Sequence, residues 1–133
     1  MDIVFFFLTA HTYLRFIVLA LGVLGVLRAL VSLGTRNATF MRVDEVLSRG
    51  YTGALDLQVA VGAILVLIRL GQSVQVMWLH PLLMLPAVFV AHLGRRYQGR
   101  PDRERQKAQL AIYAGSLILV ALGLAVIGEL RLA

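Results

Sequence analysis

Two histidines stand at the beginnings of apolar stretches, where ionisable side chains are uncommon. His11 precedes Arg15 by four residues in the run LTAHTYLRFIVLALGVLGVLRALVSL, and His80 begins the run HPLLMLPAVFVAHLGRR. Residues four apart share one face of a helix, so His11 and Arg15 would point the same way. Neutral imidazole is the commonest protein ligand of transition metals, and two imidazoles from facing helices can hold a haem iron on opposite sides. This pattern predicts a haem b between His11 and His80.

Two arginines would complete such a site. A haem carries two propionate groups, which need cationic partners where the ring meets the membrane surface, and Arg15 and Arg69 are expected at the depth of the histidines. The alternative is that His11 and His80 lie at the interface and contact headgroups and water, while Arg15 extends outward along its apolar stem. The sequence leaves both interpretations open.

A second group of polar residues, Asp56, Gln58 and His92, is expected nearer the opposite membrane surface. Ionisable groups inside a bilayer cost about 2.5–3.5 kcal/mol each and usually face the interior of the helix bundle. Asp56 and His92 come from successive antiparallel segments, so the two side chains could meet and relay a proton, for example to a quinone headgroup. The simpler interpretation, which we prefer, is a structural clasp in which Gln58 completes the hydrogen bonds of the pair.

The elements that must position these residues are long apolar segments. The chain has 133 residues, 59% of them hydrophobic, and a mean hydropathy of +0.83. About 20 apolar residues cross a hydrocarbon core, and four segments meet this requirement, namely 7–33, 53–70, 76–94 and 108–128. A helix satisfies all of its backbone hydrogen-bonding groups within hydrocarbon. The sequence therefore predicts an all-α membrane protein in which 1–133 form a single up-down-up-down bundle of four transmembrane helices.

Basic residues gather in two of the three connections between these segments. The first and third connections, with the adjoining helix ends, contain ten of the thirteen Lys and Arg residues: Arg28, Arg36, Arg42, Arg49, Arg95, Arg96, Arg100, Arg103, Arg105 and Lys107. Loops rich in Lys and Arg stay in the cytoplasm, so both termini should face the periplasm of a bacterial inner membrane. The net charge of +6 then reports topology, since the short loops offer no folded basic surface for nucleic acid.

The residue content also excludes several classes of chemistry. The chain has no cysteine, which rules out disulfides, thiolate metal sites and covalently attached c-type haem. It contains no GxxxxGK[ST], HExxH or GxSxG sequence. We therefore expect no catalytic residue, and at most electron transfer as part of a larger redox complex.

The order of four short sequences carries a resemblance to a known group of proteins. HTYLRF, LDLQVAVGAILVL, HPLLMLPAVFVAHLGRR and KAQLAIYAGSLILVALGLAVI follow one another along nearly the whole chain. In this order they resemble small bacterial four-helix integral membrane proteins of the cytochrome-b-like or uncharacterised type. The matching positions are His11, Arg15, Gln58, His80 and Met84.

Two positions depart from that pattern. The group often has a histidine in the second helix, where this chain has Asp56, and Pro81 follows His80 here. If the second-helix histidine is an axial ligand in the group, a haem in this chain depends wholly on His11 and His80.

These observations together predict a small integral-membrane subunit or partner of a respiratory or photosynthetic electron-transport complex. Its partners would be other membrane subunits and the lipid bilayer. The alternative is a cofactor-free accessory subunit that stabilises a larger membrane complex, and a third possibility is a quinone or proton site at Asp56 and His92.

Overall fold

Helices make up almost all of the chain that the structure describes. The computed structural model describes residues 2–72 and 78–132, with side chains up to residue 128. It contains α1 (Ile3–Leu33), α2 (Arg42–Gly71), α3 (Leu79–His92), a short 3-10 helix η1 (Leu93–Tyr97) and α4 (Asp102–Leu132). The prediction of an all-α chain with four helices is therefore confirmed.

Three of these helices are long and apolar enough to cross a membrane. They are α1, α2 and the Asp102–Gly128 part of α4, and each contains an 18-residue stretch with few charged residues. In hydrocarbon such a helix leaves no backbone donor or acceptor unpaired along its length. With 14 residues, α3 is too short to qualify alone, and η1 continues the chain directly after it.

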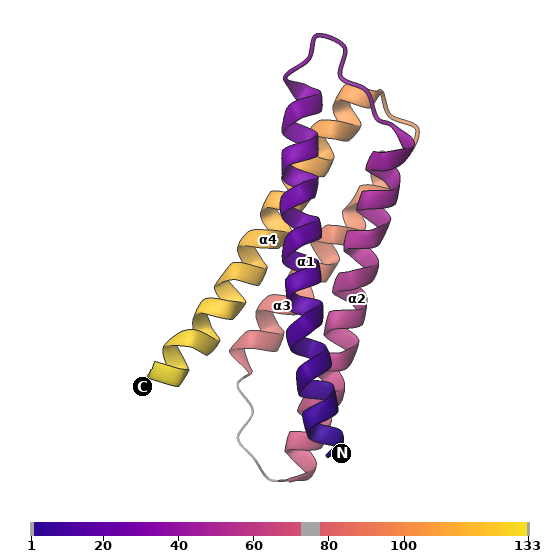
Figure 1. Ribbon diagram of the computed structural model, residues 1–133. Helices are drawn as coiled ribbons and strands as arrows, with labels where there is room; N and C mark the ends of the chain where they lie inside the picture. The colour runs from indigo at the N-terminus through magenta and orange to yellow at the C-terminus, as the bar shows by residue number, and fades with distance from the viewer. Residues whose placement is uncertain (1, 73–77, 133) are drawn as a thin grey trace.

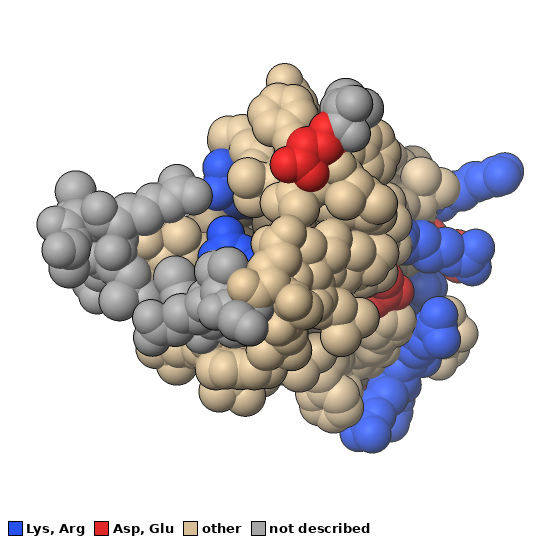
Figure 2. Space-filling view, turned by 90° about the horizontal axis from the view of Figure 1, so that it is seen from below, with Lys and Arg blue, Asp and Glu red and all other residues tan. Residues whose placement is uncertain are grey.

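The helices run up, down, up and down along one bundle (Figure 1). α1 packs against α2 and α4, and α3 packs against α4 and α2. The two arginine-rich connections lie at one end of the bundle, whereas α1 begins and α4 ends towards the other (Figure 1). Seen from the end where α1 begins, the described surface consists mainly of uncharged residues around a few charged groups (Figure 2).

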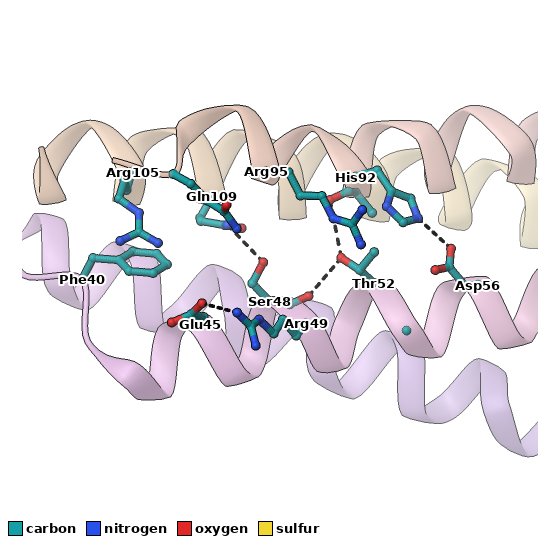
Figure 3. A pocket seen from close by; sticks show the side chains of 14 residues that line it. Phe40, Glu45, Ser48, Arg49, Thr52, Asp56, His92, Arg95, Arg105 and Gln109 are labelled. Carbon is teal, nitrogen blue, oxygen red and sulfur yellow. Dashed lines mark hydrogen bonds and ion pairs between the residues drawn. The ribbon is translucent and has the colours of Figure 1, made fainter. Parts of the chain in front are cut away.

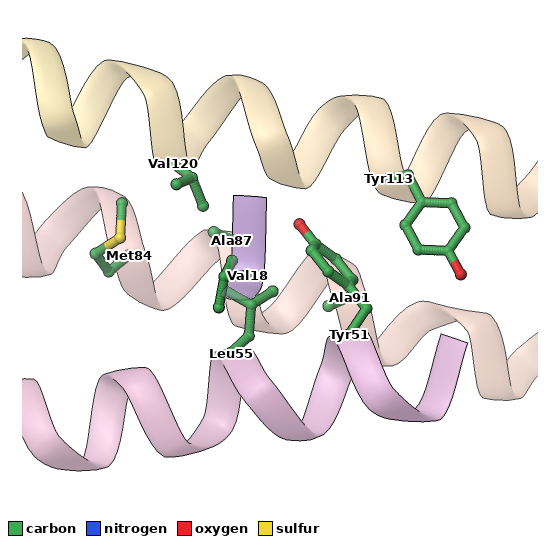
Figure 4. Packing of buried hydrophobic residues seen from close by; sticks show 8 residues of the cluster. All are labelled: Val18, Tyr51, Leu55, Met84, Ala87, Ala91, Tyr113 and Val120. Atoms are coloured by element: carbon green, nitrogen blue, oxygen red, sulfur yellow. The ribbon is translucent and has the colours of Figure 1, made fainter. Parts of the chain in front are cut away.

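The core lies midway along the bundle and combines aliphatic, aromatic and small residues. Its buried members are Val18, Tyr51, Leu55, Met84, Ala87, Ala91, Tyr113 and Val120 (Figure 4). The Tyr51 and Tyr113 rings meet edge to face with their centroids 5.2 Å apart. The Tyr51 hydroxyl lies 2.6 Å from the Ser116 hydroxyl, so this polar group is satisfied inside the bundle.

Glycines in α1 make room for the aromatic rings. Gly22 and Gly25 are buried. A Cβ on Gly25 would lie 2.5 Å from the Tyr113 ring, and one on Gly22 would lie 2.9 Å from the Tyr51 ring. The face of α1 that carries these two glycines therefore receives tyrosine side chains from α2 and α4.

A buried ion pair holds the arginine-rich end together. The Asp44 carboxylate is 5% exposed and accepts hydrogen bonds from the Arg28 guanidinium, whose Nε lies 2.9 Å away, and from the Met41 backbone N–H at 2.8 Å. One carboxylate thus joins α1 to α2 and also caps the start of α2.

Candidate functional site

The structure brings the two predicted iron ligands together. The His11 ring on α1 and the His80 ring on α3 meet edge to face, with centroids 6.3 Å apart and planes at 77°. His80 is the second residue of α3, and Pro81 lies within the first turn, where its missing N–H leaves no partner unpaired. Two histidines that are 69 positions apart therefore occupy one depth in the bundle.

One nitrogen of His80 is held by α4. His80 Nδ1 lies 3.0 Å from the Gly123 carbonyl oxygen. Because a carbonyl can only accept, Nδ1 must carry the proton, which leaves the lone pair on Nε2. Metal-binding histidines in proteins are usually held in this way through their second nitrogen. A side chain at position 123 would collide with Met84 and approach His80 Nδ1 to 3.2 Å, so glycine permits this contact.

The other histidine turns its nitrogens towards α2. The Gln58 side-chain amide donates to His11 Nε2 at 3.2 Å, and a Cβ on Gly62 would lie 3.2 Å from His11 Cε1. His11 Nδ1 and Gln58 Oε1 are buried and have no hydrogen-bond partner among the described residues. His11 would therefore have to release Gln58 before its Nε2 could bind a metal.

The two arginines expected near the histidines have different surroundings. Arg15 is half-buried, and its guanidinium lies 5.1 Å from the centroid of the Phe16 ring. Arg69 is exposed in the last turn of α2. Neither arginine forms an ion pair with a residue in the described ranges.

The structure separates Gln58 from the two residues with which it was grouped. Asp56 Oδ1 lies 2.9 Å from His92 Nε2. Gln58 is buried, and its side chain is hydrogen-bonded to His11 instead. Residues two apart point to different sides of a helix. Asp56 thus faces the end of α3, and Gln58 belongs with the histidine pair. This correction follows from helix geometry alone.

A polar cavity of about 440 Å³ adjoins the Asp56–His92 pair (Figure 3). It lies between α2, the end of α3, η1 and the start of α4. Arg95 and Arg105 project into it from η1 and α4, and Gln109 donates to the Ser48 hydroxyl at 3.0 Å on its wall (Figure 3). Sequence reasoning treated both arginines only as topology signals. Arg105 and Gln109 are four residues apart, and this spacing indicates that their side chains lie on the same face of the fourth helix.

The Asp56–His92 contact gives the quinone prediction a direct test. If the Asp56 carboxylate relays a proton during quinol turnover, Asp56→Asn should slow turnover by about a hundredfold, which is typical for loss of a general base. Quinol oxidation by membranes that contain the chain measures this effect, and Asp56→Glu should retain most of the rate. Equal rates for wild type and Asp56→Asn would leave the structural clasp as the explanation of the pair.

Comparison with known protein families, with characterised proteins and with solved structures finds no match to this chain. The resemblance to small cytochrome-b-like membrane proteins therefore stays a prediction from short sequences.

Proposed function

We propose that this chain is a small integral-membrane subunit or partner of a respiratory or photosynthetic electron-transport complex in a bacterial inner membrane. The observation that supports this proposal most strongly is the His11–His80 pair, because two imidazoles from separate helices meet within an apolar bundle. Polar and ionisable groups at such depth are costly and commonly mark function.

In this proposal the chain crosses the membrane four times, with both termini in the periplasm. α3 has 14 residues, which span about 21 Å at 1.5 Å per residue. The five residues of η1 add about 10 Å at 2 Å per residue, and Arg95 and Arg96 in its last turn would lie at the membrane surface. Together α3 and η1 approach the thickness of a hydrocarbon core, about 30 Å. The clustering of arginines at one end of the bundle supports a cytoplasmic location for that end.

The proposed cofactor is a haem b, whose iron cycles between two oxidation states and carries one electron. His11 and His80 would hold the iron, since their rings meet with centroids 6.3 Å apart. His80 would offer Nε2, since Nδ1 is held by the Gly123 carbonyl. His11 would use Nε2 after exchanging Gln58 for the metal. Arg15 and Arg69 would be the partners of the propionates.

A specific observation favours a second candidate, a cofactor-free accessory subunit. His11 is hydrogen-bonded to α2 and His80 to α4, so each ring already joins two helices. Large apolar side chains such as Phe5, Leu27 and Phe89 are exposed on the outside of the bundle. In a membrane these surfaces contact lipid or the helices of a larger complex.

An absorbance measurement distinguishes the two candidates. Purified protein in mild detergent should show the sharp α-band of a reduced b-type haem after dithionite is added. The band should disappear in His80→Ala and in His11→Ala, while His92→Ala should keep it, because His92 is the last residue of α3 and pairs with Asp56 instead of either ring.

The absence of any band in wild-type protein would reject the haem proposal. The accessory role then predicts that the double variant His11→Ala, His80→Ala leaves the electron flux of the host complex unchanged when the subunit is present in normal amount. A reduced flux with normal assembly would contradict that role.

A further inference from the structure

We propose that the cavity at the arginine-rich end binds a phosphate group, supplied by the headgroup of an anionic glycerophospholipid or by free phosphate. The cavity volume of about 440 Å³ lies within the range of roughly 300–1,000 Å³ that is common for small-molecule sites. This proposal does not depend on the electron-transport role, since none of its residues contacts His11 or His80 in the contacts described above.

The charges around the cavity favour an anion. Glu45 is neutralised by Arg49 at 2.6 Å, and Asp56 is paired with His92 at 2.9 Å. These pairings account for both carboxylates that line the cavity. With His92 counted as neutral, the three arginines that line the cavity outnumber its two carboxylates, so one positive charge is in excess there.

Two guanidinium groups are the candidate ligands of the anion. Arg95 and Arg105 line the cavity and form no ion pair with any residue in the ranges 2–72 and 78–128. The guanidinium of Arg105 lies 3.6 Å from the centroid of the Phe40 ring, which restricts its orientation. Figure 3 shows both groups reaching from η1 and α4 towards α2. Guanidinium groups bind phosphate oxygens through paired N–H donors.

A buried amide adds a further polar contact on the cavity wall. Gln109 is 8% exposed and donates to Ser48, and its Oε1 is buried without a hydrogen-bond partner among the described residues. Buried polar atoms in proteins almost always have a partner. If the amide turned towards the cavity, a hydroxyl on a lipid headgroup such as glycerol would donate to this oxygen, whereas the choline headgroup has no donor to offer.

The location of the cavity also suits a lipid phosphate. It lies beside the arginine-rich connections, at the end of the bundle where the apolar stretches stop. Basic pockets between transmembrane helices at such a level bind phospholipid headgroups. A quinone headgroup is uncharged and would leave Arg95 and Arg105 without a counter-charge, so the charges favour phosphate over quinone in this cavity.

Native mass spectrometry of the full-length protein tests the proposal. Wild-type protein in detergent is mixed with phosphatidylglycerol or phosphatidylcholine, and the retained lipid is counted. Each arginine near an anionic surface contributes roughly a fivefold factor, so we expect about a 30-fold preference for phosphatidylglycerol. Arg95→Gln with Arg105→Gln should abolish this preference. Arg96→Gln with Arg103→Gln should keep it, because this control removes the same charge from η1 and α4 outside the cavity.

A second measurement, with inorganic phosphate as the probe, distinguishes a lipid headgroup from free phosphate as the ligand. One outcome is that wild-type protein broadens the ³¹P signal of inorganic phosphate while the Arg95→Gln, Arg105→Gln variant does not. If wild type also shows no lipid preference, this result supports the site and assigns it to free phosphate. Circular dichroism checks that both double variants are folded. If wild type prefers neither ligand, or if the control variant loses the preference as fully as the cavity variant, the proposal is overturned.

Discussion

Alanine in place of Gly25 is expected to destabilise the folded bundle by about 1–3 kcal/mol, the usual range for overpacking of a core. The new Cβ would lie 2.5 Å from two atoms of the Tyr113 ring. That ring is 3% exposed and packs against Tyr51, so it has no free space into which it can move. Separation of α1 from α4 is the remaining response. Unfolding of purified protein by increasing SDS in mixed micelles, followed by circular dichroism, measures the loss.

Gly53→Ala is the matched control for this prediction. Gly53 lies inside α2, and a Cβ there would meet no atom within 4 Å. Alanine favours a helix over glycine by up to about 1 kcal/mol, so this variant should be as stable as wild type or slightly more so. Similar losses for the two variants would show that the contact between Gly25 and Tyr113 does not determine the result.

Asp44→Asn is expected to cost about 3 kcal/mol, near the lower end for breaking a buried ion pair. Asparagine keeps an acceptor for the Met41 N–H but leaves the Arg28 guanidinium without a counter-charge. The Arg28 side chain is 29% exposed, and solvent therefore offsets part of the loss. The same unfolding measurement in mixed micelles gives the magnitude.

The neighbouring residue provides the comparison for Asp44. Glu45 pairs with Arg49 four residues away, and both side chains are well exposed. Pairs of this kind contribute less than about 1 kcal/mol, so Glu45→Gln should change stability little. If Asp44→Asn were as mild as Glu45→Gln, the link between α1 and α2 would have to depend on contacts other than this ion pair.

Hydropathy predicted the number and order of the helices but not where they begin. The expected apolar segments started at 53 and 108, whereas α2 begins at Arg42 and α4 at Asp102. For α4 the sequence does predict this start, because a proline followed by an aspartate, as at Pro101 and Asp102, is typical of a first helical turn. Both helices carry two acidic residues in their first turn, where carboxylates favour the positive end of the helix dipole. Apolar residues thus predict the part of a helix that is suited to lipid. The start of the helix lies in polar turns beyond that part and is indicated by the acidic residues of the first turn.

The sequence predicted the depth of the polar residues better than their partners. Depth along a helix follows from residue count, which is why His11 and His80 could be expected at one level. Partners depend on rotation about the helix axis and on which helices are neighbours. The contact between His80 and Gly123 can be predicted only if it is known that α3 packs against α4. The expected start of the third segment at residue 76 lies outside the described residues.

Three rings in this bundle each rest on a glycine of a neighbouring helix: Tyr113 on Gly25, His11 on Gly62 and His80 on Gly123. If one helix slid along its neighbour by a single turn, about 5.4 Å, the ring would meet the residue four positions away. For Tyr113 that residue is Leu21 or Ala29, and for His80 it is Leu119 or Ile127, all of which carry side chains. Displacement of a helix along its axis is therefore opposed at these three contacts.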